Sequence, residues 1–310
     1  MILINVGKPS LHHPVKSRIM TLKPLGHEEL SDMEIVQRCA DPHRELVGTL
    51  ENVVKLSNDV VVKFGWNVSV EEACNQRRAF ELLDRNIVRI PRVYRHFTQS
   101  NGDGWPDSGY LVMEYIPGKV LGEDEIPSNE QVERIAHILQ YFSTILGDRP
   151  GPLEGGASRG LLWEENGKPV FKNVQQMERW LNLRLPDVDA KLSLEKYPLV
   201  LCHLDLAPRN IVWLADGSVS LLDWCSAGGL TINSDSVLPY WYLLLEYIKA
   251  DWALCIGFYP RFFEVCMLKI MECSHGSYEL DLIERMGKLT EDEENQMKLL
   301  QRSFYNGIKY

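Results

Sequence analysis

The sequence predicts an α+β fold in two lobes, a small N-terminal lobe built on an antiparallel sheet with one helix and a larger, mainly helical C-terminal lobe. Three observations support this fold class. Short runs rich in Val, Ile and Tyr, separated by turn residues, dominate the chain as far as residue 116. Pro117-Gly118 then interrupts that pattern, and amphipathic helical periods follow. We therefore expect an N-lobe of residues 1–116, which includes an N-terminal extension, and a C-lobe of residues 117–310.

The N-terminal half carries clear start and stop signals. Ser31, with Glu34 three residues later, forms the capping box of a helix over Asp32–Ala40. The remaining elements predicted for this half are strands over Leu46–Leu56, Val60–Phe64 and Tyr110–Ile116, a further strand led by Arg89–Tyr94, and a helix over Val70–Asn86.

The C-terminal half reads as helices on either side of a hairpin. Helical spacing predicts helices over Ser128–Leu146 and Val174–Leu185, and again from Leu238 to the C-terminus. Between them, two short apolar arms are joined at Asp216-Gly217, a pair that suits a two-residue type I′ turn. The sequence therefore predicts a β-hairpin in the middle of a helical lobe.

The composition is that of an ordinary globular protein. The 310 residues are 45% hydrophobic and 25% charged, and the net charge of −10 disfavours a general nucleic-acid binder, which needs clustered Lys and Arg. Seven scattered cysteines without a CxxC pair indicate reduced thiols rather than disulfides or a zinc site. No signal peptide or long apolar run is recognisable. We expect a cytoplasmic protein with no nucleic-acid or membrane partner, and the sequence leaves its oligomeric state open.

The most informative stretch is His203–Asn210, which reads HLDLAPRN and is followed by Asp223 after the hairpin. A hairpin with two nearly equal arms brings the residues before and after it together, so Asn210 and Asp223 should project from one end, a loop away from Asp205. Converging oxygen atoms suit Mg²⁺ and leave one carboxylate to accept a proton. We assign Asn210 and Asp223 as metal ligands and Asp205 as the base, which indicates phosphoryl transfer. His203 is expected to hold the loop.

Phosphoryl transfer also needs a cation on the nucleotide phosphates. Lys63, at the end of a Val-Val-Val strand, is the candidate, and Glu72 on the following helix would orient it. Glu71 is an open alternative, because the sequence does not fix which side of the helix faces inward. The backbone of Glu114 and Ile116, just before the break, is a candidate for binding the adenine edge.

Gly48 lies where a nucleotide-covering turn would fall, but the segment around it is not a glycine-rich loop. The pattern GxxxxGK[ST] does not occur anywhere in the chain, which excludes a P-loop NTPase. Because Lys63 lies on a strand and Asp223 follows the hairpin, the nucleotide site is expected between the strands and the hairpin.

Taken together, these pieces resemble the aminoglycoside phosphotransferase and choline kinase-like family, which shares the two-lobed protein-kinase fold. The resemblance covers about residues 46–250 and is carried by HLDLAPRN, by Asp223-Trp224 and by Met113–Gly118, which reads MEYIPG. It implies ATP and Mg²⁺ as cofactors. The roles that it implies are an ion pair on the nucleotide side for Lys63 and Glu72, the base for Asp205, and metal ligation for Asn210 and Asp223.

Protein kinases proper are less similar, because Ala207 stands where their catalytic loop has a lysine. Two departures from the small-molecule family concern Cys225, which stands where that family often has a glutamate, and the low glycine content of the phosphate-covering turn. Neither departure removes a residue assigned to the metal or the base. The first affects the acceptor side of the predicted site.

We therefore expect an ATP- and Mg²⁺-dependent phosphotransferase that phosphorylates a hydroxyl group of a small molecule. The alternative is a catalytically silent or repurposed protein of the same fold, which binds a ligand or partner or serves a different transfer. The aromatic residues of Trp241–Phe263 would either wall an acceptor pocket or form helical core. The sequence does not identify the acceptor.

Overall fold

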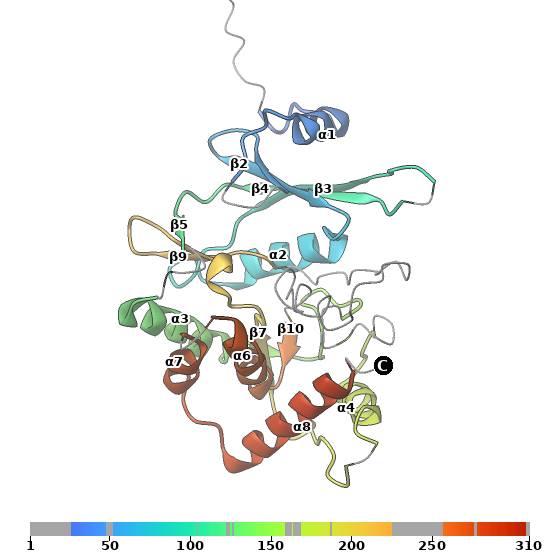
Figure 1. The fold of residues 1–310 in the computed structure, drawn as a ribbon, viewed down its shortest axis with the longest axis vertical. Coiled ribbons are helices and arrows are strands. Elements are labelled where there is room, and N and C mark those ends of the chain that lie inside the picture. The colour runs from blue at the N-terminus through green and yellow to red at the C-terminus, as the bar shows by residue number, and fades with distance from the viewer. Residues whose placement is uncertain are drawn as a thin grey trace, which may run out of the picture.

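The structure is a computed structural model that describes residues 26–47, 52–103, 105–121, 125, 127–158, 163, 169–186, 188–224, 257–275 and 278–307 (Figure 1). A four-stranded sheet with a helix on either side forms one part, and helices with two small sheets form the other. The predicted α+β class is confirmed. Among the helices of the described residues, none has the length and apolar character needed to cross a bilayer.

The N-terminal sheet is fully antiparallel. It contains β1 (Val53–Lys55), β2 (Val60–Gly65), β3 (Val93–Gln99) and β4 (Ser108–Glu114), in the order β1-β2-β4-β3. Figure 1 shows α1 (Asp32–Ala40) on one face and α2 (Val70–Leu82) on the other.

The alternation of side chains along β2 decides what each face of the sheet carries. Val60 and Val62 are buried in a cluster with Ile35 and Cys39 of α1. Because neighbouring residues of a strand point to opposite faces, Lys63 is directed to the face covered by α2. A short β-branched strand thus places one cation beneath the sheet.

Helix α2 is unusual in burying polar side chains. Ser69 caps it by accepting a hydrogen bond from the Glu72 N–H at 3.2 Å, and Glu72, Asn75 and Gln76 are all buried. Asn75 Oδ1 accepts from the Leu153 N–H at 3.0 Å, and Gln76 Nε2 donates to the Pro91 carbonyl at 2.8 Å. The inner side of α2 is therefore held by hydrogen bonds.

The prediction of a single strand over Leu46–Leu56 is wrong. Leu46 forms an antiparallel bridge with Val54, so two segments within this stretch pair with each other. A run of apolar residues does not by itself reveal that the chain reverses within it. Gly48 lies between the paired segments and outside the described residues.

The helix predicted over Val70–Asn86 ends at Leu82. Leu83 takes an extended conformation and is buried, and the Asp84 side chain accepts the Asn86 N–H at 2.9 Å. An aspartate that bonds the backbone two residues later favours a turn over another helical turn. Local side-chain chemistry thus ends the helix.

One strand boundary also differs from the prediction, because β4 ends at Glu114, two residues before the predicted Ile116. The segment Arg89–Tyr94 leads into a further strand, as predicted, since β3 begins at Val93. Arg89 also bridges in parallel to Ser220 of the central hairpin, so this segment joins two sheets.

The hairpin belongs to a small sheet of β5 (Lys119–Val120), β8 (Ile211–Trp213) and β9 (Val219–Leu221). β5 follows directly on Pro117-Gly118. A side chain at Gly118 would bring a Cβ within 2.4 Å of Val212 Cγ1, so the close approach of the two strands requires glycine here. The predicted lobe boundary between residues 116 and 117 remains a prediction.

The C-terminal part is mainly helical. The predicted helix over Ser128–Leu146 is α3 (Asn129–Phe142), which ends where the Ser143 and Thr144 hydroxyls donate to carbonyls of its last turn. The stretch from Leu238 is described from residue 257 onward, and this described part begins with a strand that precedes the helices. The other elements are β6 (Leu146–Gly147), α4 (Val174–Leu183), β7 (Leu199–Cys202), η2 (Pro208–Asn210), β10 (Gly257–Tyr259), α6 (Phe262–His275), α7 (Tyr278–Arg285) and α8 (Glu291–Gly307).

Candidate active site

The loop from His203 to Ala207 leaves β7 in a strained conformation that a buried carboxylate stabilises. Leu204 has a left-handed φ of 62°, which costs a non-glycine residue about 1 kcal/mol. Glu264 of α6 accepts the His203 N–H at 2.7 Å and the Leu204 N–H at 3.1 Å, and it is only 3% exposed. Burial raises the pKa of Glu264 to about 7, although the backbone donors oppose this shift. An element distant in sequence thus fixes the loop.

His203 lies fully buried behind this loop. Its Nδ1 accepts the Asp205 N–H at 3.3 Å, which leaves Nε2 to donate to the Leu222 carbonyl at 3.2 Å, and its ring packs edge-on against Trp224. Burial lowers the pKa of His203 to about 4, so it is neutral at pH 7. These contacts agree with the predicted structural role.

The hairpin forms, but its turn is not the predicted type I′. Gly217 has a left-handed φ of 81°, whereas Asp216 does not, and type I′ needs both. The Gly217 N–H donates to the Leu214 carbonyl and the Leu214 N–H to the Ser218 carbonyl, each at 3.0 Å. These bonds describe a three-residue loop with a glycine bulge. Asp216 Oδ1 accepts the Ser218 N–H at 2.9 Å, which favours this turn.

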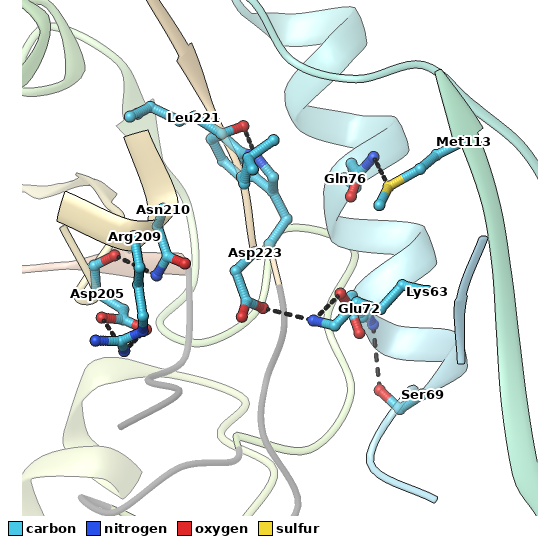
Figure 2. Close-up of polar contacts among 12 residues, drawn as sticks. Lys63, Ser69, Glu72, Gln76, Met113, Asp205, Arg209, Asn210, Leu221 and Asp223 are labelled. Atoms are coloured by element: carbon cyan, nitrogen blue, oxygen red, sulfur yellow. Dashed lines mark hydrogen bonds and ion pairs between the residues drawn. The ribbon is translucent and has the colours of Figure 1, made fainter. Parts of the chain in front are cut away.

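Lys63 meets two carboxylates that come from different parts of the chain (Figure 2). Its Nζ lies 2.8 Å from Glu72 Oε1 and 3.0 Å from Asp223 Oδ1. Of the two glutamates that the sequence left open, Glu72 is thus shown to pair with Lys63. Burial opposes the charged form of Asp223, but Lys63 and Arg209 outweigh it and hold the pKa of Asp223 below its usual value.

Asp205 lies on the other side of Asp223 in Figure 2 and is 2% exposed. Arg209 Nη2 donates to both of its carboxylate oxygens, at 3.1 and 3.0 Å. Burial raises the pKa of Asp205 to about 6, against the lowering influence of Arg209. A carboxylate whose pKa lies this close to neutrality is suited to accept a proton at physiological pH.

The oxygen donors of Asn210 and Asp223 fit Mg²⁺. Asn210 Nδ2 donates to the Asp205 carbonyl at 3.1 Å, and Figure 2 shows its amide oxygen turned toward the side on which Asp223 lies. Magnesium in proteins is commonly held by one or two side-chain oxygens together with substrate phosphates. Within the described part of the chain, no group of three or more His, Cys, Asp and Glu side chains could hold a metal ion unaided.

Glu114 is tied into the sheet by both its backbone and its side chain. Its N–H donates to the Arg92 carbonyl at 2.9 Å, and its Oε1 accepts from Arg89 Nη2 at 3.1 Å. The Glu114 N–H is thus already used within the N-terminal sheet. Ile116 is buried, with 6% exposure. The roles of both residues remain predictions.

Sequence reasoning missed two residues. Arg209 lies inside the HLDLAPRN motif, and its spacing of four residues from Asp205 was a usable signal that was passed over. Glu264 follows the motif by about 60 residues in an otherwise apolar helix start, and only its burial reveals it. Two predictions fall outside the described residues, namely Cys225 and most of the aromatic stretch Trp241–Phe263.

Comparison with known proteins provides one family match. The family model described as "Phosphotransferase enzyme family" matches residues 44–228, which is more than half of the chain. The search of curated protein sequences returned no significant match.

Several solved structures are distantly similar. The choline kinase LicA from Streptococcus pneumoniae is 16% identical, with 85% of this chain and 82% of that chain covered and a TM-score of 0.44. The GDP and kanamycin complex of APH(2")-IIia is 16% identical, with 86% of both chains covered and a TM-score of 0.44. A microcompartment-associated aminopropanol kinase is 13% identical, with 89% and 88% covered and a TM-score of 0.46.

Proposed function

The chain belongs to the phosphotransferase enzyme family, and from this premise we propose that it transfers the terminal phosphoryl group of ATP to a hydroxyl group of a small molecule. The observation that supports the proposal most is the 3.0 Å contact of Lys63 with Asp223, which joins the N-terminal sheet to the central hairpin beside the buried Asp205. Phosphoryl transfer requires a cation on the phosphates, oxygen ligands for a metal and a base near the acceptor. These side chains supply all three.

On the nucleotide side, Lys63 binds the phosphates and Glu72 keeps its ammonium group in place. The short Lys63–Glu72 distance of 2.8 Å and the burial of Glu72 support this arrangement. The Glu114 carbonyl and the Ile116 backbone bind the adenine edge. Gly48, the candidate for covering the phosphates, lies outside the described residues. The base end and the phosphate end of ATP are thus bound by separate strands.

Asn210 and Asp223 hold Mg²⁺, which when bound offsets the negative charge of the phosphates. The low pKa of Asp223 keeps it a carboxylate, and the hydrogen bond from Asn210 Nδ2 to the Asp205 carbonyl keeps the amide oxygen on the metal side. The chain's own contribution is to orient these two donors before the nucleotide arrives.

On the acceptor side, Asp205 receives the proton of the attacking hydroxyl. Its backbone N–H donates a hydrogen bond to His203 Nδ1, and Glu264 accepts hydrogen bonds from two backbone N–H groups of the same loop. The bond from the acceptor oxygen to phosphorus forms while the bond to the ADP oxygen breaks, and ADP leaves with that electron pair. The proton released from the hydroxyl passes to an Asp205 oxygen.

The test measures thermal stabilisation of the full chain by ATP, with and without Mg²⁺. We expect Mg²⁺-dependent stabilisation of the wild type, its loss in Asp223→Ala, and its retention in Asp107→Ala, an exposed aspartate in the loop between β3 and β4. Asp205→Asn should bind ATP normally but not transfer phosphoryl groups. The absence of Mg²⁺-dependent stabilisation in the wild type would instead favour a catalytically silent protein.

The acceptor is then sought by incubating the wild type and Asp205→Asn with metabolite pools and labelled ATP. A labelled product formed by the wild type alone identifies the acceptor. Normal turnover by Asp205→Asn on that acceptor would remove Asp205 from its role as the base.

A further inference from the structure

The guanidinium of Arg209 is placed where the proposed reaction needs it, and among the described residues it contacts the proposed base. Its Nη2 alone donates to the two oxygens of Asp205. The Arg209 side chain is 43% exposed, whereas Asp205 is 2% exposed. Figure 2 shows the pair on the side of Asp223 opposite to Lys63. An exposed cation thus lies over a buried carboxylate.

The charges that surround this pair favour a second role. Three carboxylates, those of Glu72, Asp205 and Asp223, meet two cations, Lys63 and Arg209, in the described part of the site. Lys63 already contacts two of the carboxylates. Since His203 is neutral at pH 7, it adds no positive charge. An incoming triphosphate adds several negative charges, so a further cation facing its terminal phosphate would stabilise binding.

The position of Arg209 in the chain supplies that cation. It lies on η2 immediately before Asn210, so one short turn carries both the guanidinium and a proposed metal ligand. Ala207, two residues earlier in the same loop, is uncharged, so Arg209 supplies the positive charge of this loop. A guanidinium presents five N–H donors, and contact through a single nitrogen leaves the fork geometry that suits phosphate oxygens unused on Asp205.

We propose that Arg209 binds the terminal phosphoryl group of ATP and, in moving to it, releases the Asp205 carboxylate for the acceptor hydroxyl. The inference rests on the proposed function. The guanidinium remains protonated throughout, while the hydroxyl proton passes to Asp205 and ADP leaves with the electrons of the broken bond. Asp205 is thereby shielded until the phosphoryl donor has bound.

The test compares nucleotides that differ in the terminal phosphate. Calorimetry with Mg²⁺ measures the affinities of the full chain for ADP and for a non-hydrolysable ATP analogue. In Arg209→Met we expect the affinity for the analogue to fall about tenfold, the effect of losing a charge-assisted hydrogen bond, with the affinity for ADP nearly unchanged. Arg78→Met is the matched control, because Arg78 is 45% exposed and lies on α2.

Arg209→Lys provides a second variant that keeps a cation at the position, and it should recover part of the preference for the analogue. Equal loss of both affinities in Arg209→Met, or no loss, would overturn the inference while leaving the proposed function intact. A lysine variant as weak as the methionine variant would also overturn it, because charge would then not be responsible. Failure of the wild type to bind either nucleotide would overturn the proposed function, and this inference with it.

Discussion

Glu72 illustrates how one buried side chain determines the geometry of the nucleotide side. It is 1% exposed, and its Oε1 accepts from Lys63 Nζ at 2.8 Å. A buried ion pair adds little to stability in itself, but removing one partner leaves the other charge uncompensated. Lys63 would then lose its contact with Glu72 while keeping the one with Asp223.

We expect Glu72→Gln to weaken ATP binding by about tenfold, because the amide replaces a charge-assisted hydrogen bond by a weaker one. Glu81→Gln is the matched control, since Glu81 lies on the same helix, is 65% exposed and pairs with Arg78. Calorimetry on the two variants measures the difference. Equal affinities for ATP in both would show that Glu72 does not orient Lys63 in solution.

At the scale of elements, the loop between β7 and η2 depends on a carboxyl group carried by α6. Glu264 holds two backbone N–H groups of that loop, at a cost, because burial raises its pKa from 4.5 to about 7. The folded chain therefore binds a proton at this site more tightly than the unfolded chain does. Its contribution to the free energy of unfolding falls as the pH rises from about 4.5 to about 7.

Glu264→Gln should remove this pH dependence. The free energy of unfolding of the wild type, relative to the variant, should decrease by up to about 3 kcal/mol between pH 5 and pH 8, since one pKa unit corresponds to about 1.4 kcal/mol. Urea unfolding at several pH values measures it. A difference between the two proteins that does not change with pH would contradict this account of Glu264.

The elements that could be predicted from the sequence are those whose stabilising residues lie close together in the chain. The capping boxes at Ser31 and Ser128 are formed by residues three positions apart, and both helices begin as the sequence indicates. The contact of Glu264 with the loop joins residues about 60 positions apart and left no pattern in the sequence. In the site, residue types assigned Lys63 and Asp223 to one reaction, whereas their direct contact and the cover provided by Arg209 needed side-chain positions.

At the scale of the whole molecule, the chain has the α+β fold that the sequence predicted, and one hydrophobic core joins the α2 region to the mainly helical part. That core includes Ala79 and Leu83 of the α2 region together with Ile135 and Phe142 of α3. A core shared in this way couples the unfolding of the two parts, because neither can separate without exposing apolar surface of the other.

We therefore expect a single unfolding transition that coincides when followed by circular dichroism and by tryptophan fluorescence. Leu83→Ala, at a residue 5% exposed, should lower the free energy of unfolding by about 2–5 kcal/mol, and unfolding should still occur in a single transition. Leu183→Ala, at a residue 78% exposed, should change it by less than about 0.5 kcal/mol. Two separate transitions in the Leu83 variant would show that the parts are stable independently.

Arg89 has a further consequence for the choice of nucleotide. Its N–H donates to the Val219 carbonyl at 2.8 Å, its carbonyl accepts the Leu221 N–H at 3.0 Å, and its side chain contacts Glu114. The strand that leads to Asp223 and the strand end proposed to bind adenine are thus attached to one residue. Under the proposed function, Arg89 fixes the distance between the adenine site and the phosphate site. Ligands would then be selected by the distance between their base and their terminal phosphates.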